Sequence, residues 1–375
     1  MNTTKGLSIE DHFANIRDPR QAHKTSHSLL EIITLTICAV ICGANTWVEV
    51  ETYGRANENW LKTFLALPNG IPSHDTLGRV FSLLDPKALE ASFQSWVATI
   101  AEQVEGVVAI DGKTVRRSHD SASGKSAIHL VSAWCSDAGL VLGQLKTDEK
   151  SNEIKAIPEL LKMLVIKGCV VTIDAMGCQK TIAQKIVDQE ADYVFTLKGN
   201  QEKLHDEVRD LFQHAHEINF EGMEWSYFET ESKGHGRHEI RRYWLVPTPD
   251  ELVHVKKWPQ LNSIGMVEYE CQIPGQESTR EYRYFITSLK GDAQLFAKAV
   301  RSHWGIENSV HWVLDVVFRE DDSRVRIGHA AENFGLIRRL VLNLLKREKT
   351  AKVGMRAKRL KAAVDENYLM KVLGG

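Results

Sequence analysis

Residues 106–118 read GVVAIDGKTVRRS, and residues 168–180 read GCVVTIDAMGCQK. In each segment a short apolar run rich in Val and Ile follows a glycine and is closed by an aspartate, Asp111 in the first and Asp174 in the second. Apolar runs of this length and composition are typical of buried strands. An aspartate that closes a buried strand projects toward the edge of the sheet, where a functional site can form. We therefore expect Asp111 and Asp174 to lie at the ends of two strands.

A third acidic residue, Glu307, lies within residues 301–318, RSHWGIENSVHWVLDVVF, a stretch compatible with a helix. Two strand-end aspartates and a helical glutamate can hold two divalent ions, because Mg²⁺ or Mn²⁺ takes oxygen ligands and carboxylates are the usual protein contribution. Two such ions about 4 Å apart clamp the attacking and leaving oxygens of a phosphodiester. The three acids therefore predict a metal-dependent phosphoryl-transfer enzyme.

A zinc site is the competing interpretation of the stretch around Glu307. His303, Glu307, His311 and Asp315 recur every four residues and share one helix face, a spacing that can hold zinc. The zinc signature H-E-x-x-H is absent, and no cysteine pair lies nearby. We favour a metal on Glu307, with His303 and His311 beside phosphate or carboxylate.

The order of elements along the chain predicts an α/β fold. Strand patterns and helix patterns alternate in the middle of the sequence, with strands at 106–111, 127–136, 140–147, 169–175 and 193–198 and helices at 152–164 and 179–191. Three strands, a helix, a strand, a helix and a strand fit a mixed sheet with crossover helices. This is the order of the ribonuclease H-like fold, in which the first and fourth strands carry the two aspartates.

The remaining segments divide the chain into further regions. We expect residues 101–200 and 291–345 to form the ribonuclease H-like mixed sheet with its flanking helices. Residues 201–290 begin with a helix and continue with aromatic and β-branched runs, which predicts a β-rich insertion. Residues 1–100 are helical in pattern and form the expected N-terminal domain.

Two regions carry a possible signal for DNA. The segment SHDTLGRVF at 73–81 follows a clear loop and could be the second helix of a helix-turn-helix, although most such helix pairs are only structural. From Arg338 to the C-terminus there are 11 Lys or Arg against 3 acidic residues, a local charge of +8. The basic tail at 346–375 could bind phosphate or be a solvated, partly helical tail.

Composition sets the limits of the class of protein. The chain has 375 residues, a net charge of −2 and six cysteines without a C-x-x-C pair, which favours a reducing compartment. The most apolar stretch, at 29–44, is too short to span a membrane and predicts a buried core helix. Because the first residues lack an apolar leader pattern, we expect a cytoplasmic protein. No glycine-rich phosphate loop is present, so no nucleotide cofactor is expected.

Several segments together resemble a known family. These are AIDGKT, IDAMGCQ, DYVFTLKGNQ, GHGRHEIRR, HWGIENSVHWVLDVVFREDDSR and the N-terminal DPRQAHKTSHSLLEIITLTICAVICGA. Over nearly its whole length the chain resembles bacterial insertion-sequence transposases of the DDE type, in the H-repeat-associated (ISAs-type) group. The resemblance implies a ribonuclease H-like catalytic domain with a β-rich insertion. It also implies that Asp111, Asp174 and Glu307 are the catalytic triad and the metal ligands.

The resemblance implies a transposase that cuts DNA at the inverted repeats of its element and joins the freed 3′ hydroxyl to target DNA. Mg²⁺ or Mn²⁺, as two ions, would be the cofactor, DNA the partner, and a homodimer the working form, with no role for a membrane. Two alternatives are a nuclease of the same fold that does not join strands and a non-catalytic DNA-binding relic of an insertion element.

The basic residues near the acids are the predicted DNA contacts. The broader group places Tyr, Arg, Glu and Lys around the last acid as Y-x2-R-x3-E-x6-K, and only the Glu matches when Glu307 is aligned, since Val300, His303 and Leu314 occupy the other positions. We therefore look elsewhere for phosphate contacts, and the predicted set is Lys113, Arg116, Arg117, Lys198, Arg237, Arg241, Arg301, His303 and His311.

In the insertion, basic residues alternate with aromatic ones. His235, Arg237, Arg241 and Arg242 lie close in sequence to Trp225, Tyr243 and Trp244. Such a pattern suits stacking on an unpaired or flipped base, and it equally suits the core of a small β structure. Both interpretations stay open at this point.

Overall fold

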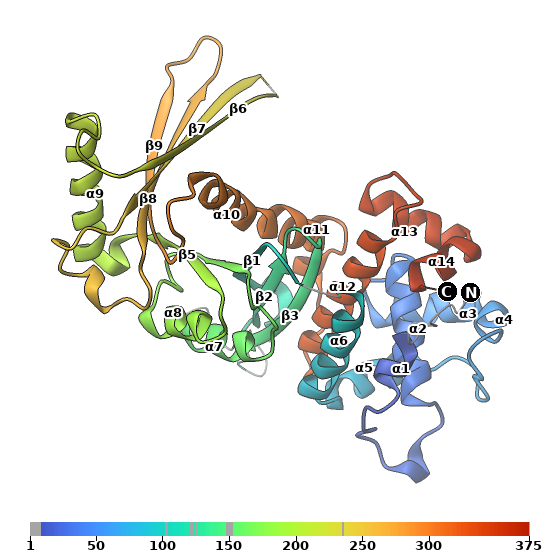
Figure 1. Ribbon diagram of the computed structural model, residues 1–375. Coiled ribbons are helices and arrows are strands. Elements are labelled where there is room, and N and C mark those ends of the chain that lie inside the picture. Colours follow the sequence, from blue (N-terminus) through green and yellow to red (C-terminus); the bar gives the residue numbers. More distant parts are fainter. Residues whose placement is uncertain are drawn as a thin grey trace, which may run out of the picture.

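The computed structural model describes residues 9–101, 104–119, 124, 126–147, 153–234 and 236–374. One nine-stranded sheet organises the molecule, in the order β3-β2-β1-β4-β5-β9-β8-β7-β6 (Figure 1). The strands are β1 (Val107–Thr114), β2 (His129–Cys135), β3 (Leu140–Thr147), β4 (Val170–Ile173), β5 (Asp192–Leu197), β6 (Ser226–Gly234), β7 (Arg237–Pro247), β8 (Ser263–Gln272) and β9 (Thr279–Thr287).

The first five strands form the ribonuclease H-like part of the sheet. Strand β1 pairs antiparallel with β2 and parallel with β4, which in turn pairs parallel with β5. Parallel neighbours need crossover connections, and helices α7 (Glu153–Lys162) and α8 (Lys180–Val187) lie in them. The predicted order of three strands, helix, strand, helix, strand is confirmed.

The end of β1 differs from the sequence-based expectation. Asp111 does not close the strand, because β1 continues to Thr114 in antiparallel register with β2. The parallel pairing of β1 with β4 ends one residue before Asp111, at Ile110 opposite Ile173. Asp111 and Asp174 are therefore the residues that follow the last pair of this parallel ladder. The sequence correctly placed both aspartates at the same end of two neighbouring strands. It did not show that β1 continues beyond Asp111, because that extension depends on pairing with β2.

The predicted insertion belongs to the same sheet as β1 to β5. Strand β9 pairs antiparallel with β5 on one side and with β8 on the other, so that β6 to β9 prolong the same sheet. Figure 1 shows these strands as a long twisted ribbon, with α9 (Glu202–Glu217) at its side. Helix α10 (Ala293–Ile306) packs against β1 and β4 and also against β6 and β7, and thereby joins the two parts.

The N-terminal region is helical, as predicted. Its helices are α1 (Ile9–Phe13), α2 (Leu29–Ile41), α3 (Trp47–Ala56), α4 (Glu58–Leu61), α5 (His74–Leu83) and α6 (Pro86–Ile100). Helix α5 begins after Ser73, whose side chain accepts a hydrogen bond from the backbone N–H of Thr76. The helical stretch after Thr46 is divided at Asn57, whose side-chain amide donates to the carbonyl of Tyr53 at 2.9 Å. An asparagine that bonds to the backbone in this way competes with the regular helix.

Helix α2 is a core helix. Eleven of its thirteen residues are buried, among them Ile33, Ile37 and Val40. Burial on nearly all sides explains why this stretch is the most apolar of the chain. None of the helices in the described ranges is both long enough and apolar enough to cross a membrane.

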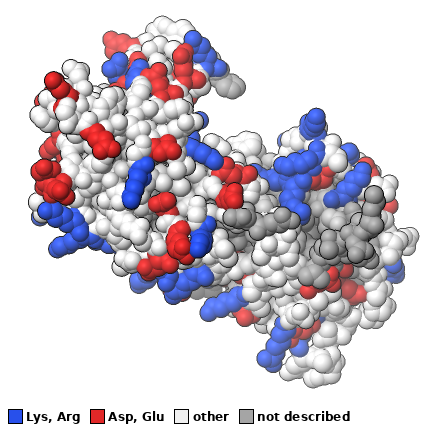
Figure 2. Space-filling view, viewed as in Figure 1, with Lys and Arg blue, Asp and Glu red and all other residues white. Residues whose placement is uncertain are grey.

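The C-terminal segment is not a solvated tail. After α12 (Ala330–Arg347), the helices α13 (Met355–Val364) and α14 (Glu366–Leu373) pack against α2 and α12. Lys358 and Arg359 are buried, and Arg359 donates to the carbonyl of Val40 at 2.9 Å. Part of the local positive charge thus serves to hold the helices together. Figure 2 shows Lys and Arg side chains gathered over this region, where Arg356 and Lys361 are exposed.

Candidate active site

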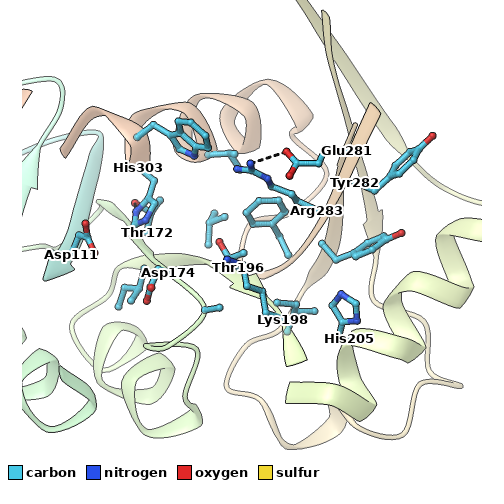
Figure 3. A pocket seen from close by; sticks show the side chains of 18 of the residues that line it. Asp111, Thr172, Asp174, Thr196, Lys198, His205, Glu281, Tyr282, Arg283 and His303 are labelled. Atoms are coloured by element: carbon cyan, nitrogen blue, oxygen red, sulfur yellow. Dashed lines mark hydrogen bonds and ion pairs between the residues drawn. The ribbon is translucent and has the colours of Figure 1, made fainter. Parts of the chain in front are cut away.

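The three predicted catalytic acids border one pocket. Asp111 on β1, Asp174 after β4 and Glu307 after α10 line a cavity of about 470 Å³. Figure 3 shows Asp111 and Asp174 on one side of this pocket and Lys198 and Arg283 on the other. Three segments that are far apart in the sequence therefore converge on the pocket because β1 and β4 are adjacent and α10 crosses them.

Backbone N–H groups hold one oxygen of each aspartate. Oδ1 of Asp111 accepts a hydrogen bond from the N–H of Gly112 at 2.8 Å. Oδ1 of Asp174 accepts from Met176 at 3.0 Å and from Gly177 at 3.3 Å. These bonds orient both carboxylates and leave Oδ2 of each outside this backbone network.

The two glycines beside the aspartates are required by close packing. A Cβ atom on Gly112 would lie 2.3 Å from Nε2 of His129 and 2.4 Å from Oε1 of Glu153. A Cβ atom on Gly177 would lie 2.2 Å from Cγ2 of Ile173. The sequence features Asp-Gly and Asp-x-x-Gly thus have a steric origin at both aspartates.

The helix that carries Glu307 is not regular. A π-helical segment, Glu307–His311, separates α10 from α11 (Trp312–Val316). His303 and His311 consequently contact different strands: His303 Nδ1 lies 3.1 Å from Oγ1 of Thr172, and His311 Nδ1 lies 3.4 Å from Oδ2 of Asp111. Both histidines reach the site, but they do not form the zinc-binding face that a regular helix would present.

Burial and like charge raise the pKa of Asp111 to about 7. Burial is the largest cause, the bond from Gly112 opposes it, and the negative charges of Asp174, Glu153 and Glu307 add to it. A carboxyl with this pKa is about half protonated at neutral pH, and a bound cation would favour its ionised form.

The two histidines are neutral at neutral pH. Burial lowers the pKa of His303, and burial together with the cations Arg339 and Lys113 lowers the pKa of His311 to about 3. Neutral imidazoles cannot attract phosphate by charge. Their roles are therefore limited to hydrogen bonding and to packing beside Thr172 and Asp111.

The donor set suits a hard divalent ion. The acids at the pocket offer only carboxylate oxygens, which is the chemistry that Mg²⁺ and Mn²⁺ prefer. Across the described ranges, no three His, Cys, Asp or Glu side chains lie close enough together to coordinate a metal ion in their present conformations. The exposed side chain of Glu307 would have to turn toward Asp111 and Asp174 to complete such a site.

Four of the Lys and Arg residues predicted to contact DNA line two cavities. Lys198 lines the pocket of the three acids. Arg237, Arg241 and Arg301 line a second cavity of about 310 Å³ between the insertion strands and α10. The two cavities adjoin, because both are lined by Arg283 and other residues of β9 and α10. A continuous hollow with several cations therefore leads away from the acids.

Three basic residues after Asp111 face acidic partners. Arg116 and Arg117 are exposed and lie 3.2 Å and 3.7 Å from carboxylate oxygens of Asp321 and Asp322. Lys113 differs from the prediction: its side chain is only 9% exposed, and its ammonium lies among carboxylates of the chain itself. The structure does not place Lys113 on a surface that DNA phosphates can reach.

The aromatic residues of the insertion mostly form its core. Tyr243 and Trp244 are buried, and Trp244 packs against His216 of α9 with ring centroids 4.9 Å apart. Trp225 is 44% exposed and stacks on Phe220. This packing favours the core interpretation over base stacking. His235 lies outside the described residues.

Sequence reasoning missed a buried pair beside the site. Glu153 at the start of α7 and His129 of β2 are in hydrogen-bond contact, and both are almost fully buried. Glu153 contributes to the raised pKa of Asp111. Arg283 and Tyr282 of β9 were missed as well, because their segment was recognised only as a strand. For the buried pair, the only available signal was His129 inside an apolar strand, because Glu153 lies in the polar stretch DEKSNEIK at 148–155.

Comparisons with known proteins identify the family of the chain. Residues 10–97 match the family model described as DDE_Tnp_1-associated, and residues 102–344 match the model described as Transposase DDE domain. The chain is 44% identical to "H repeat-associated putative transposase YhhI" of Escherichia coli K12 over 372 residues, which cover 98% of each chain. It is also 44% identical to "Putative transposase YncI" of Escherichia coli O157:H7 over 370 residues, 98% of this chain and 94% of that one.

Among solved structures, the chain aligns with the piggyBac transposase in a cryo-EM structure of its synaptic complex with hairpin DNA. The TM-score is 0.40 and the identity 10%, over 98% of this chain and 78% of that chain, a likeness too distant to add to the argument. The two family models together cover most of the sequence, and the relatives match it nearly from end to end. The chain therefore belongs to the DDE transposase family and is related to the H-repeat-associated transposases.

Proposed function

We propose that the protein cuts DNA at the ends of an insertion element and joins the freed 3′ hydroxyl to target DNA. The observation that carries the proposal is the convergence of Asp111, Asp174 and Glu307 on one pocket in a chain of the DDE transposase family. The three carboxylates would hold two Mg²⁺ or Mn²⁺ ions. A pair of these chains would bring the two ends of the element together.

The residues of the site have separate tasks in this proposal. Asp111 and Asp174 are already oriented by backbone N–H groups that bind one oxygen of each, and their other oxygens would hold the ions. Bound divalent ions would lower the pKa of the attacking water or 3′ hydroxyl and stabilise charge on the leaving oxygen. Lys198, exposed at the end of β5, adds a positive charge on the far side of the pocket, where it offsets charge that develops on the phosphate.

The second cavity supplies a path for the DNA backbone. Among the described residues neither Arg237 nor Arg301 forms an ion pair with an acid, and both side chains are exposed. Arg241 is held by Glu239 at 2.8 Å and lies over the ring of Tyr269. In this cavity, Arg237 and Arg301 are therefore the cations that can contact DNA phosphates in place of water.

We predict that the double variant Arg237→Ala, Arg301→Ala binds DNA more weakly whatever its sequence. The slope of log affinity against log salt should become shallower by up to about two units, since each phosphate contact contributes roughly 0.9. Fluorescence anisotropy with labelled duplexes over a series of salt concentrations measures this slope. The control is Arg209→Ala on α9, where a likewise exposed guanidinium pairs with Asp206 at 2.8 Å. An unchanged slope in the double variant would remove the second cavity from the DNA path.

A strand-transfer assay separates the proposed function from its two rivals. A duplex that carries a labelled, pre-cut element end with a free 3′ hydroxyl is incubated with the protein, Mg²⁺ and a supercoiled target. We expect the label to become covalently joined to the target. Cleavage of an uncut end without joining would indicate a nuclease of the same fold, and binding without either reaction would indicate a relic.

A further inference from the structure

Lys113 occupies a cage of three carboxylates. Its Nζ lies 2.6 Å from Oδ1 of Asp315, 2.7 Å from Oδ1 of Asp321 and 3.8 Å from Oε2 of Glu320. Lys113 stands two residues after Asp111 on β1. The three acids come from α11 and the turn that follows it, shortly after Glu307 in the chain. The cage therefore ties the strand of the first catalytic acid to the segment that follows the third.

A second set of contacts links the cage to α12 and β2 through Arg339. Glu320 is fully buried, and Nη1 of Arg339 on α12 donates to its Oε1 at 3.0 Å. Nε of Arg339 donates to Oγ of Ser132 at 3.1 Å. Ser132 lies on β2 directly opposite Asp111. The path from Lys113 through Glu320 and Arg339 to Ser132 thus begins and ends beside Asp111.

Glu320, Arg338 and Arg339 form the buried part of this cluster, whereas Asp315 and Asp321 are 32% and 25% exposed. Lys113, Arg338 and Arg339 face Asp315, Glu320 and Asp321, and Lys113 and Glu320 have side-chain exposures of 9% and 0%. Buried pairs gain little stability over apolar side chains, but they are costly to break. Their directional contacts fix one arrangement of the elements that carry them. A shift of α11 along β1 would separate the ammonium of Lys113 from two carboxylates at once.

A π-helical segment lies between α10 and the cage. Glu307 stands at its beginning, where the helix changes from the regular hydrogen-bond pattern to the wider π pattern. This change shifts the register of α11 relative to α10. The cage attaches α11 to β1 on the far side of this segment.

We propose that Lys113 is a positioning residue, which sets the spacing between Asp111 and the Glu307 segment and thereby the width of the gap that divalent ions must span. This role replaces the phosphate contact expected from its place after Asp111. The inference rests on the proposed function, in which Asp111, Asp174 and Glu307 hold the ions.

The test is Lys113→Met, which removes the charge and keeps much of the side-chain length. Binding of Mn²⁺ to the protein with element-end DNA is followed by electron paramagnetic resonance, and DNA affinity and its salt slope are measured in parallel. We expect Mn²⁺ affinity to fall about 10- to 100-fold, the range for residues that orient metal ligands, with DNA affinity and slope unchanged. Unchanged Mn²⁺ affinity would overturn the proposal, as would a salt slope reduced by about one unit without loss of Mn²⁺ affinity.

The matched control is Lys358→Met. The side chain of Lys358 is also 9% exposed and donates to the carbonyl of Leu345 at 2.8 Å, in the C-terminal helices. We expect this variant to lose thermal stability but to keep the Mn²⁺ affinity of the wild type. If it weakens Mn²⁺ binding as much as Lys113→Met does, general loosening explains the effect and the proposal fails. If Lys113→Met does not fold, Asp321→Asn removes one of the two short contacts, and the same loss of Mn²⁺ affinity is expected.

Failure of the proposed function gives a different result. Wild-type protein and the variant Glu307→Gln would then bind Mn²⁺ equally well, which overturns both the metal site and the role of Lys113. Loss of Mn²⁺ affinity in Glu307→Gln, combined with full affinity in Lys113→Met, overturns only the role of Lys113.

Discussion

Replacing Asp174 by asparagine is expected to slow cleavage of element-end DNA by about a thousandfold or more, and Asp111→Asn and Glu307→Gln should have effects of the same order. Divalent ions in such sites supply several kcal/mol of stabilisation to the transition state, and each tenfold change in rate corresponds to about 1.4 kcal/mol. Single-turnover cleavage of a labelled end in saturating Mg²⁺ measures the chemical step directly.

The controls for this prediction concern folding and ordinary acids. Asp188→Asn changes an exposed aspartate at the end of α8 and should cleave at the wild-type rate. Asp111→Asn should stabilise the metal-free protein at pH 8, because the folded state raises the pKa of this carboxyl to about 7 and so disfavours its charge. That advantage should shrink as the pH falls from 7 toward 4, where the wild-type carboxyl takes up its proton. Near wild-type cleavage by any of the three site variants would show that the residue is not a ligand.

The largest loss of stability is expected for Arg339→Ala. Arg339 is fully buried and bonds to Glu320, to Ser132 and to the carbonyl of Gly335. Removing one partner of a buried ion pair leaves an uncompensated charge and costs about 3–5 kcal/mol of unfolding free energy. Urea unfolding followed by circular dichroism gives the difference from the wild type.

Arg319→Ala is the matched surface change. Arg319 is 66% exposed and pairs with Asp322 at 3.2 Å, close in sequence to the same cluster. Exposed pairs of this kind contribute about 0–1 kcal/mol. If Arg339→Ala loses no more stability than Arg319→Ala does, the buried cluster does not hold β2, α12 and the turn at Glu320 together.

The positions of the two aspartates could be predicted because their signals are local. An apolar run, an acid and a nearby glycine mark Asp111 and Asp174, and the order of strands and helices placed both runs in one sheet. Glu307 has no such local signal. It was a candidate as an acid in a helix-compatible stretch where a zinc site was an alternative, the resemblance to a family implied its catalytic role, and the structure brings it to the same pocket.

Features that depend on distant partners could not be predicted. Lys113 reads as a surface cation beside Arg116, and its burial follows from Asp321, 208 residues away in the chain. The π-helical segment is invisible to a periodicity argument, because the residues around it fit a regular helix equally well. The pairing of β9 with β5, which makes the insertion part of the catalytic sheet, is likewise a long-range choice.

The burial of basic residues in the C-terminal helices also could not be predicted from the sequence. The local charge of +8 left two interpretations open, a tail that binds phosphate and a solvated tail, but Lys358 and Arg359 are buried in contacts with the carbonyl groups of Leu345 and Val40. Composition counts charges without regard to their partners. Only the exposed cations, such as Arg356 and Lys361, remain available to DNA.

The most direct test of the account is to locate Mn²⁺ by its anomalous X-ray scattering in crystals of the protein bound to element-end DNA. We predict anomalous peaks in the pocket bordered by Asp111, Asp174 and Glu307, with carboxylate oxygens of all three residues as ligands. Peaks that lie elsewhere, or that are coordinated without Glu307, would contradict the central claim that these three acids form one metal-binding site.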